Sequence, residues 1–162
     1  MDFPRLIKNS KSAEAESRAF SGWSPNKREQ KVLADHQCPQ GLTRVDQMWQ
    51  WLKEHYGQIL AVEAIHQSPP ESYNYLELAN KISIAASAFK SLGVSSGDVV
   101  ALFSENSPRW LIADQGLMRV GAANAVRGSS APVQELRYIL DDSRSVGLII
   151  QSSQLWEDLS LS

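Results

Sequence analysis

Two short polar segments could bind an anion, because each follows an apolar run and precedes a helical pattern. The first is residues 104–107, where free main-chain amides and the dipole of the following helix could hold a negative charge. A simpler interpretation is that Ser107 only caps that helix and Asn106 stabilises the turn, and the residue types favour it. The second segment is residues 126–130, in which Arg127 could meet a phosphate or carboxylate. A solvated loop arginine is the more ordinary explanation there.

Isolated acidic residues give weaker signals. Asp114 borders an apolar helical face, and a partly buried carboxylate can be catalytic. Pairing with a neighbouring arginine at the edge of that face is the favoured prediction. Asp141 and Asp142 are adjacent, so on a helix they do not face each other, and they indicate a solvated helix end.

The histidines do not form a metal site in the sequence. His36 and Cys38 are close together, but two ligands in a polar segment do not complete a site. His55 and His66 belong to different predicted elements, with no third ligand in view. The usual phosphate-loop, dinucleotide, nucleophile-elbow and zinc-protease motifs do not occur. The sequence therefore assigns no catalytic, cofactor-binding or metal-binding residue.

The composition is that of a globular protein without a strong charge bias. The 162 residues are 43% hydrophobic, and a net charge of −2 argues against nucleic acid as a partner. Cys38 is the single cysteine, which excludes an internal disulfide and favours a reducing, cytoplasmic location. No secretory leader or membrane-spanning run is predicted. Trp49 and Trp51 leave a peripheral membrane contact open, although Trp49 is expected to pack inward and Trp51 to face away.

Residues 1–42 and residues 43–162 have different patterns. The first segment is polar, without sustained periodicity, and predicts a flexible arm. In the second, helical patterns alternate with apolar runs, which predicts an α/β fold with a mainly parallel sheet flanked by helices. The expected strands are residues 60–65, 99–103, 122–126 and 146–150, and the expected helices are residues 43–56, 74–92, 107–120, 132–142 and 153–156.

Single residues mark where several of these helices begin and end. Asn74 with Glu77 three residues later predicts a capping box, and Ser107 before a proline predicts a second helix start. Gly93 and Gly121 are expected to end the two helices that follow these caps. The run at residues 99–103 is apolar throughout, as expected for a strand covered on both faces, and residues 122–126 and 146–150 are predicted to be buried strands as well.

A series of motifs follows one order between residues 73 and 150. They are Leu92-Gly-Val, Gly97-Asp, an apolar strand, Asn106-Ser-Pro-Arg-Trp, Gly121-Ala, and Glu135-Leu-Arg-Tyr-Ile-Leu. This order resembles the opening of AMP-forming acyl-activating enzymes, the adenylate-forming acyl-CoA synthetase superfamily. The segments Arg109-Trp-Leu-Ile-Ala-Asp-Gln-Gly116 and Asn124-Ala-Val-Arg-Gly128 look closest to long-chain fatty-acid ligases of the cyanobacterial and plastid type.

The resemblance implies a Rossmann-like scaffold and an ATP-dependent acid–thiol ligation. Such enzymes join a fatty acid to AMP and then pass the acyl group to CoA or an acyl-carrier protein, using ATP and Mg²⁺. The family's Ser/Thr/Gly-rich loop ending in Pro-Lys-Gly, its Tyr-Gly-x-Thr-Glu motif, its ribose-binding Asp and its late catalytic Lys have no counterpart in the 162 residues. The resemblance therefore implies the first, incomplete part of the large N-terminal domain, which helps to build the wall behind the acyl site.

The sequence thus predicts a fragment of a long-chain fatty-acid ligase that is inactive alone, binds no cofactor itself and has the rest of the enzyme as its partner. The alternative is a stand-alone, non-catalytic α/β module with an interaction or regulatory role. An in-frame continuation with a Pro-Lys-Gly loop would support the first prediction, and a natural stop after Ser162 the second. Acyl-chain length, the choice between CoA and carrier protein, and the oligomeric state stay open.

Overall fold

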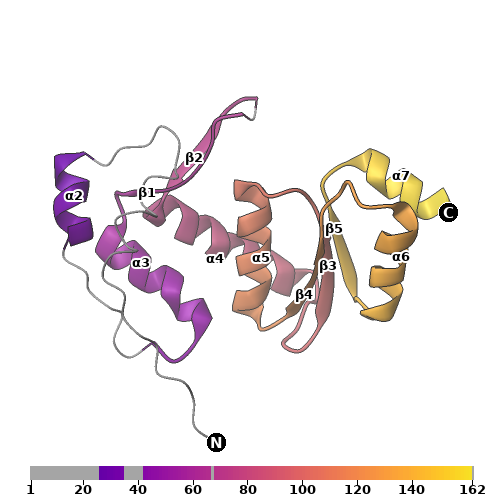
Figure 1. The fold of residues 1–162 in the computed structure, drawn as a ribbon. Helices are drawn as coiled ribbons and strands as arrows, with labels where there is room; N and C mark the ends of the chain where they lie inside the picture. The colour runs from indigo at the N-terminus through magenta and orange to yellow at the C-terminus, as the bar shows by residue number, and fades with distance from the viewer. Residues whose placement is uncertain (1–25, 35–41, 67, 162) are drawn as a thin grey trace, which may run out of the picture. The chain divides into compact units, whose positions relative to one another are not determined.

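The computed structural model describes residues 26–34, 42–66 and 68–161 (Figure 1). Contacts divide the chain into two units, residues 1–37 and 38–162. In the first unit the described element is helix α2, Lys27–Ala34, which the sequence did not predict. Its start is a capping arrangement, because Asn26 Oδ1 accepts from Glu29 N at 3.0 Å while Glu29 Oε2 accepts from Asn26 N at 2.9 Å. The rest of the predicted arm lies outside the described residues.

The second unit begins with a helical segment and a β-hairpin. A 3-10 turn at Val45–Gln47 leads into α3, Met48–Tyr56, and the hairpin consists of β1, Leu60–Ala64, and β2, Glu71–Asn74. These strands pair antiparallel and form a two-stranded sheet of their own. Helix α4, Tyr75–Ser91, then begins at the predicted capping box of Asn74 and Glu77. The side chains of α3 and α4 share one core cluster, in which the central buried residues are Trp49, Leu78, Ala79 and Ile82.

A three-stranded parallel sheet forms the centre of the second unit. Its strand order is β4-β3-β5, with β3 at Val99–Phe103, β4 at Ala123–Arg127 and β5 at Gly147–Ile150. The register pairs Ala101 of β3 with Ala125 of β4 and with Leu148 of β5. The prediction of one mainly parallel sheet is therefore confirmed.

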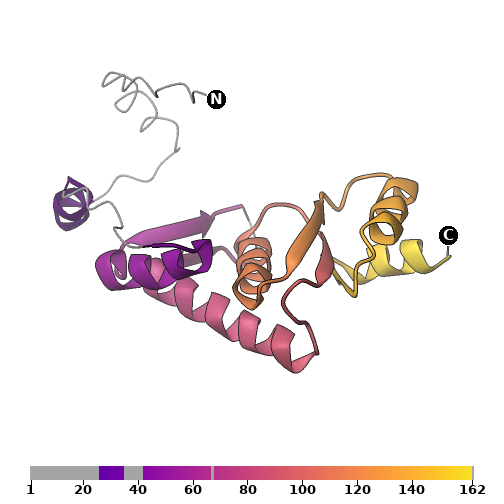
Figure 2. The same ribbon diagram turned by 90° about the horizontal axis from the view of Figure 1, so that it is seen from below.

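Helices cover both faces of this sheet (Figure 1). Helix α5, Pro108–Val120, packs along α4 on one face, while α6, Val133–Asp142, and α7, Ser153–Leu161, lie on the other (Figures 1 and 2). Because side chains alternate along a strand, Ala101 and Phe103 face the α6–α7 layer and share a core cluster with Leu136 and Leu155. This layering accounts for the burial of residues 100–103 of β3.

The other two parallel strands are less covered than the sequence predicted. Strand β4 lies at an edge, and Val126 is 44% exposed, so the prediction of a second fully buried strand was wrong. Residues of β5 are only partly buried, and Val146, expected in that strand, precedes it and is 63% exposed. Leu92, expected on the buried face of α4, is 80% exposed, since the helix ends at Ser91.

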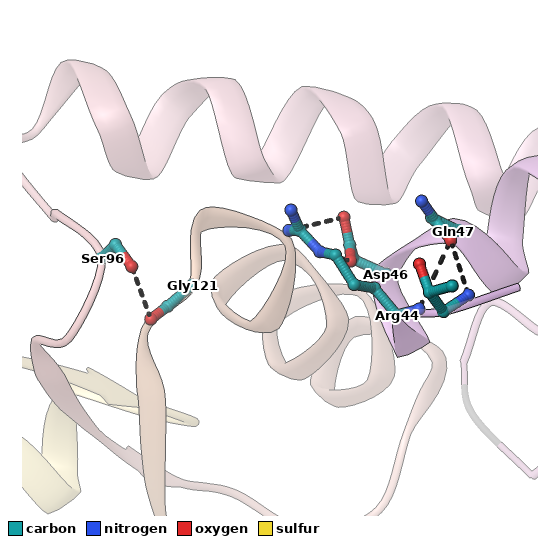
Figure 3. Close-up of polar contacts among 6 residues, drawn as sticks. Arg44, Asp46, Gln47, Ser96 and Gly121 are labelled. Carbon is teal, nitrogen blue, oxygen red and sulfur yellow. Dashed lines mark hydrogen bonds and ion pairs between the residues drawn. The ribbon is translucent and has the colours of Figure 1, made fainter.

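Two turns at the amino-terminal edge of the sheet contact each other. Ser96 Oγ and Gly97 N both donate to Gly121 O, at 3.5 and 2.9 Å, and so connect the turn before β3 to the end of α5 (Figure 3). Gly121 has a φ of 89°, a left-handed conformation that glycine adopts without strain.

A second contact in Figure 3 lies at the start of the 3-10 turn, where Arg44 Nε pairs with Asp46 Oδ1 at 2.8 Å. The described helices include none with the length and hydropathy needed to cross a membrane.

Candidate functional site

The path of the chain across the sheet reverses direction at β4. It runs from β3 through α5 to β4 on one side, and then through α6 to β5 on the other side of β3. The carboxyl ends of β3 and β5 are therefore followed by connections that leave in different directions. In open α/β sheets, ligands bind in the crevice that such a switch creates.

A pocket of about 500 Å³ lies at this switch point. Its apolar wall comes from the ends of β3 and β5 and from the first turns of α5, and its polar wall comes from the loops after the two strands. A third part of the wall is formed by Ser68 and Pro69, between β1 and β2, and by Glu71 at the start of β2. The lining residues include Pro69, Glu71, Leu102, Ser104, Glu105, Arg109, Trp110, Ala113, Ile149, Ile150 and Gln151.

Hydrogen bonds tie together the three loops at the carboxyl edge. Glu105, after β3, accepts at Oε1 from Ser129 Oγ at 3.0 Å and from Ser130 N at 3.1 Å, both in the loop after β4. Gln151, after β5, accepts at Oε1 from Glu105 N at 2.8 Å, and the same oxygen lies 3.2 Å from Ser129 Oγ, whose one proton it shares with Glu105. Ser104 Oγ adds a longer contact of 3.4 Å to the same oxygen. We call this set of residues the loop network.

The loop network favours the ionised form of Glu105. The main-chain amide of Ser130, and then the hydroxyl of Ser129, lower the pKa of the Glu105 carboxyl below its usual value. The carboxylate is exposed, so the contribution of these bonds is moderated by water. Glu105 is therefore a charged acceptor that holds the neighbouring loop, and the sequence alone did not identify it.

The structure explains Ser107 and Arg127 without a bound anion. Ser107 Oγ accepts from Trp110 N at 3.0 Å and so caps α5, as the simpler interpretation held. Arg127 Nε pairs with Glu135 Oε1 at 2.7 Å, and hydrogen bonding to Glu135 raises the pKa of this guanidinium. The prediction of a merely solvated Arg127 thus missed an ion pair across the start of α6.

Asp114 does not pair with an arginine in the described part of the chain, contrary to the prediction. Its Oδ2 accepts from Gln115 Nε2 at 2.7 Å, and its Oδ1 accepts from Asn124 Nδ2 at 2.6 Å. Gln115 Oε1 in turn accepts from the buried indole Nε1 of Trp49 at 2.7 Å. These bonds join α3, α5 and β4, and they explain Asp114 as a structural residue.

The remaining predicted residues form no site. Asp141 and Asp142 are exposed at the end of α6, as expected. His55 is exposed and stacks on Trp51, with ring centroids 4.1 Å apart, and His66 is exposed in the turn after β1. Across residues 26–34, 42–66 and 68–161 no cluster of three potential metal ligands occurs.

His36 and Cys38 lie outside the described residues. Trp49 is 7% exposed and packs with Met48 and Leu52, as predicted, whereas Trp51 lies outside that core cluster and is only partly buried. Trp49 is therefore a core residue, whereas Trp51 is not part of that core cluster.

An ion pair with unpaired neighbours forms the outer wall of the pocket. Glu71 Oε1 accepts from Arg109 Nη2 at 2.5 Å and from Arg109 Nε at 2.9 Å. Glu71 is 12% exposed in its side chain and Arg109 is 79% exposed. The second carboxylate oxygen, Glu71 Oε2, and the indole Nε1 of Trp110 are both buried without a hydrogen-bond partner. Glu71 could not be identified from the sequence, because its partner lies 38 positions away.

Comparison with known proteins identifies the family. The family model of AMP-binding enzymes matches residues 49–161. A chloroplastic long-chain-fatty-acid–acyl-carrier-protein ligase of Arabidopsis thaliana is 36% identical over 116 residues, which are 72% of this chain and 16% of the relative. Crotonobetaine/carnitine–CoA ligase of Escherichia coli is 32% identical over 111 residues, 68% of this chain and 21% of the relative. The chain thus spans about a fifth or less of the length of these relatives.

Solved structures share the fold. The N-terminal domain of FACL13 from Mycobacterium tuberculosis superposes with a TM-score of 0.69 at 20% identity, over 75% of this chain and 30% of that one. The N-terminal subdomain of Klebsiella oxytoca NpsA, in complex with anthranilyl-AMSN, gives a TM-score of 0.61 at 25% identity, over 67% of this chain and 28% of that one. The family match over residues 49–161 shows that the chain belongs to the AMP-binding enzyme family.

Proposed function

We propose that the chain is the opening part of the large N-terminal domain of an AMP-forming long-chain fatty-acid ligase. In that reaction the fatty-acid carboxylate attacks the α-phosphate of ATP, and pyrophosphate leaves. A thiol of CoA or of an acyl-carrier protein then attacks the acyl-AMP, and AMP leaves. The observation that carries the proposal is the 36% identity, over 116 residues, to a ligase that acts on long-chain fatty acids and acyl-carrier protein.

The contribution we assign to this chain is a scaffold. The buried strand β3 and the helices on both faces of the sheet support a rigid carboxyl edge, where the loop network holds three connections together. Rigid loops of this kind can position substrates and other domains. We assign no catalytic residue to the described chain, since its charged side chains at this edge are engaged in structural pairs.

The cofactors follow from the proposed reaction. ATP, Mg²⁺ and the thiol acceptor would be bound by the complete enzyme, and the 162 residues contain no phosphate loop to hold the nucleotide. Stabilising the charge on separating phosphates needs a set of preorganised donors and cations. We therefore expect this chain to be inactive when it is alone.

A chimera tests the proposal. The segment of this chain that matches the Arabidopsis ligase replaces the corresponding 116 residues of that enzyme. Pyrophosphate release with Mg-ATP and a long-chain fatty acid is then measured. We expect fatty-acid-dependent turnover, because the scaffold is interchangeable. A chimera that melts cooperatively but releases no pyrophosphate would argue instead for a non-catalytic module.

A further inference from the structure

We propose that the pocket between the ends of β3 and β5 binds an uncharged small molecule that carries an amide or hydroxyl group on an apolar body. The pocket has a volume of about 500 Å³, within the range of small-molecule sites. The proposal concerns the lining residues Glu71 and Trp110, which the loop network does not include.

The polar requirement comes from two unpaired atoms of opposite character. The indole Nε1–H of Trp110 can only donate a hydrogen bond, and an ionised carboxylate oxygen such as Glu71 Oε2 can only accept one. Both atoms are buried without a partner, and both residues line the same pocket. Buried polar groups in folded proteins are nearly always paired, so an unpaired donor and acceptor at one pocket indicate a missing partner. An amide or a hydroxyl group offers both complementary functions.

The requirement for an apolar body comes from the inner wall. Leu102, Ala113, Ile149 and Ile150 line it, and Pro69 contributes at the hairpin side. Leu102 is 1% exposed, so this wall is part of the core of the sheet and is fixed in place. An alkyl group in contact with it gains free energy by leaving water.

The requirement for an uncharged ligand comes from the lining charges. Two carboxylates, Glu71 and Glu105, line the pocket together with one guanidinium, that of Arg109. Arg109 already pairs with Glu71, so a bound carboxylate would face the second acidic group without a free cation of the lining beside it. The fatty acid of the proposed ligation is an anion, and this site is therefore separate from the proposed function.

Access to the unpaired atoms requires a side-chain movement. Both atoms are shielded from solvent in this conformation, whereas the Trp110 side chain as a whole is only partly buried. The proposal requires the Trp110 indole and the Glu71 carboxylate to reorient so that both atoms reach the pocket surface. Binding is therefore expected to change the environment of the Trp110 indole N–H more than the environments of the other tryptophan indole N–H groups.

The experiment follows the indole N–H signals of the 162-residue chain by ¹H–¹⁵N NMR. The probes are hexanamide and hexanoate, which share an alkyl chain and differ in charge. Trp110→Phe assigns the signal, and Trp156→Phe is the matched control, because Trp156 is 55% exposed on α7. Glu71→Gln keeps an oxygen for Arg109 while it converts the unpaired acceptor into a donor.

We expect hexanamide to shift the Trp110 signal saturably, hexanoate to leave it unchanged, and Glu71→Gln to weaken hexanamide binding about tenfold. Trp156→Phe should bind like the parent chain. Three outcomes would overturn the proposal: no saturable shift, equal shifts with both probes, or undiminished binding by Glu71→Gln. The proposal would also be overturned if Glu71→Gln shifted the Trp110 signal while neither probe did. In that case Glu71 and Trp110 would bond to each other, directly or through water.

Discussion

The carboxylate of Glu105 accepts a hydrogen bond from the main-chain amide of Ser130 at 3.1 Å. The two residues lie in the loops after β3 and β4, so this contact fixes the relative position of two connections at the carboxyl edge of the sheet. Gln151 extends the link to the loop after β5 through its 2.8 Å bond from Glu105 N. The side chains of Glu105 and Gln151 thus connect the loops after all three parallel strands, at the edge where ligands are expected.

The loop network predicts a pH dependence of stability. The pKa of Glu105 is lowered in the folded chain, chiefly by the Ser130 amide. A lowered pKa stabilises the fold above the ordinary glutamate pKa, and that stabilisation is lost as the pH falls through the folded value. Glu105→Gln removes this contribution, so the variant should be less stable than the parent near neutral pH and should approach it in acid. The measurement is the midpoint of thermal unfolding of the parent chain and of Glu105→Gln as a function of pH. The same pH dependence in both proteins would contradict the role of Glu105.

The close packing of α5 on α4 predicts a large effect of one methyl group. A Cβ at Gly116 would lie 2.9 Å from Ala85 Cβ and 3.3 Å from Ala86 N, so helix α4 itself would have to shift. Overpacking of this kind costs about 1–3 kcal/mol, more than the roughly 1 kcal/mol by which alanine favours a helix over glycine. Gly116→Ala should therefore lower the free energy of unfolding measured in urea.

Gly147 provides the matched control for that change. A Cβ at Gly147 would meet its nearest neighbour, Val100 Cγ1, at 3.9 Å, which is an ordinary contact distance. Gly147→Ala should leave the free energy of unfolding unchanged or raise it slightly. If the two alanine variants were equally stable, the close approach of α5 to α4 would be wrong.

The hydrogen bond from Trp49 to Gln115 predicts coupling between α3 and α5. Gln115→Leu would leave the buried indole N–H of Trp49 unpaired, at a cost of about 1–3 kcal/mol. In a Trp49→Phe background the same change should cost less, because no donor remains. Urea unfolding of the four chains measures this coupling, and Gln134→Leu, at an exposed position of α6, serves as the control. Strict additivity would show that the bond does not form in solution.

The start of α7 predicts different effects for two neighbouring serines. Ser152 Oγ accepts from Leu155 N at 3.3 Å, so Ser152 is the cap, and Ser153 is the first residue of the helix. Ser152→Ala should cost about 1 kcal/mol of stability and reduce hydrogen-exchange protection in α7. Ser153→Ala should change both by much less. Larger effects at Ser153 than at Ser152 would contradict the assignment of Ser152 as the cap.

Local signals in the sequence were sufficient for most of the elements. The capping box of Asn74 and Glu77, the cap at Ser107 and the helix end at Gly121 depend on neighbours within a few positions, and all three are confirmed. The parallel order of the strands followed from their alternation with helices, which requires crossover connections.

Features that depend on distant partners could not be predicted in the same way. Val126 lies in an apolar run, but its burial depends on whether its strand has two neighbours, and the run itself does not contain that information. Glu105 and Gln151 meet across 46 positions, and Glu71 and Arg109 meet across 38. The sequence therefore located two of the three loops of the loop network, but not the side chains that connect them.

The most direct test of the account compares pyrophosphate release by the 162-residue chain with release by the Arabidopsis ligase that contains the matching segment of this chain. Both assays use Mg-ATP and one long-chain fatty acid, and each protein is first shown to unfold cooperatively. The account predicts no release by the chain alone and fatty-acid-dependent release by the chimera, because this chain supplies the scaffold and the remainder supplies the phosphate-binding groups. Turnover by the chain alone, or a folded chimera without turnover, would contradict it.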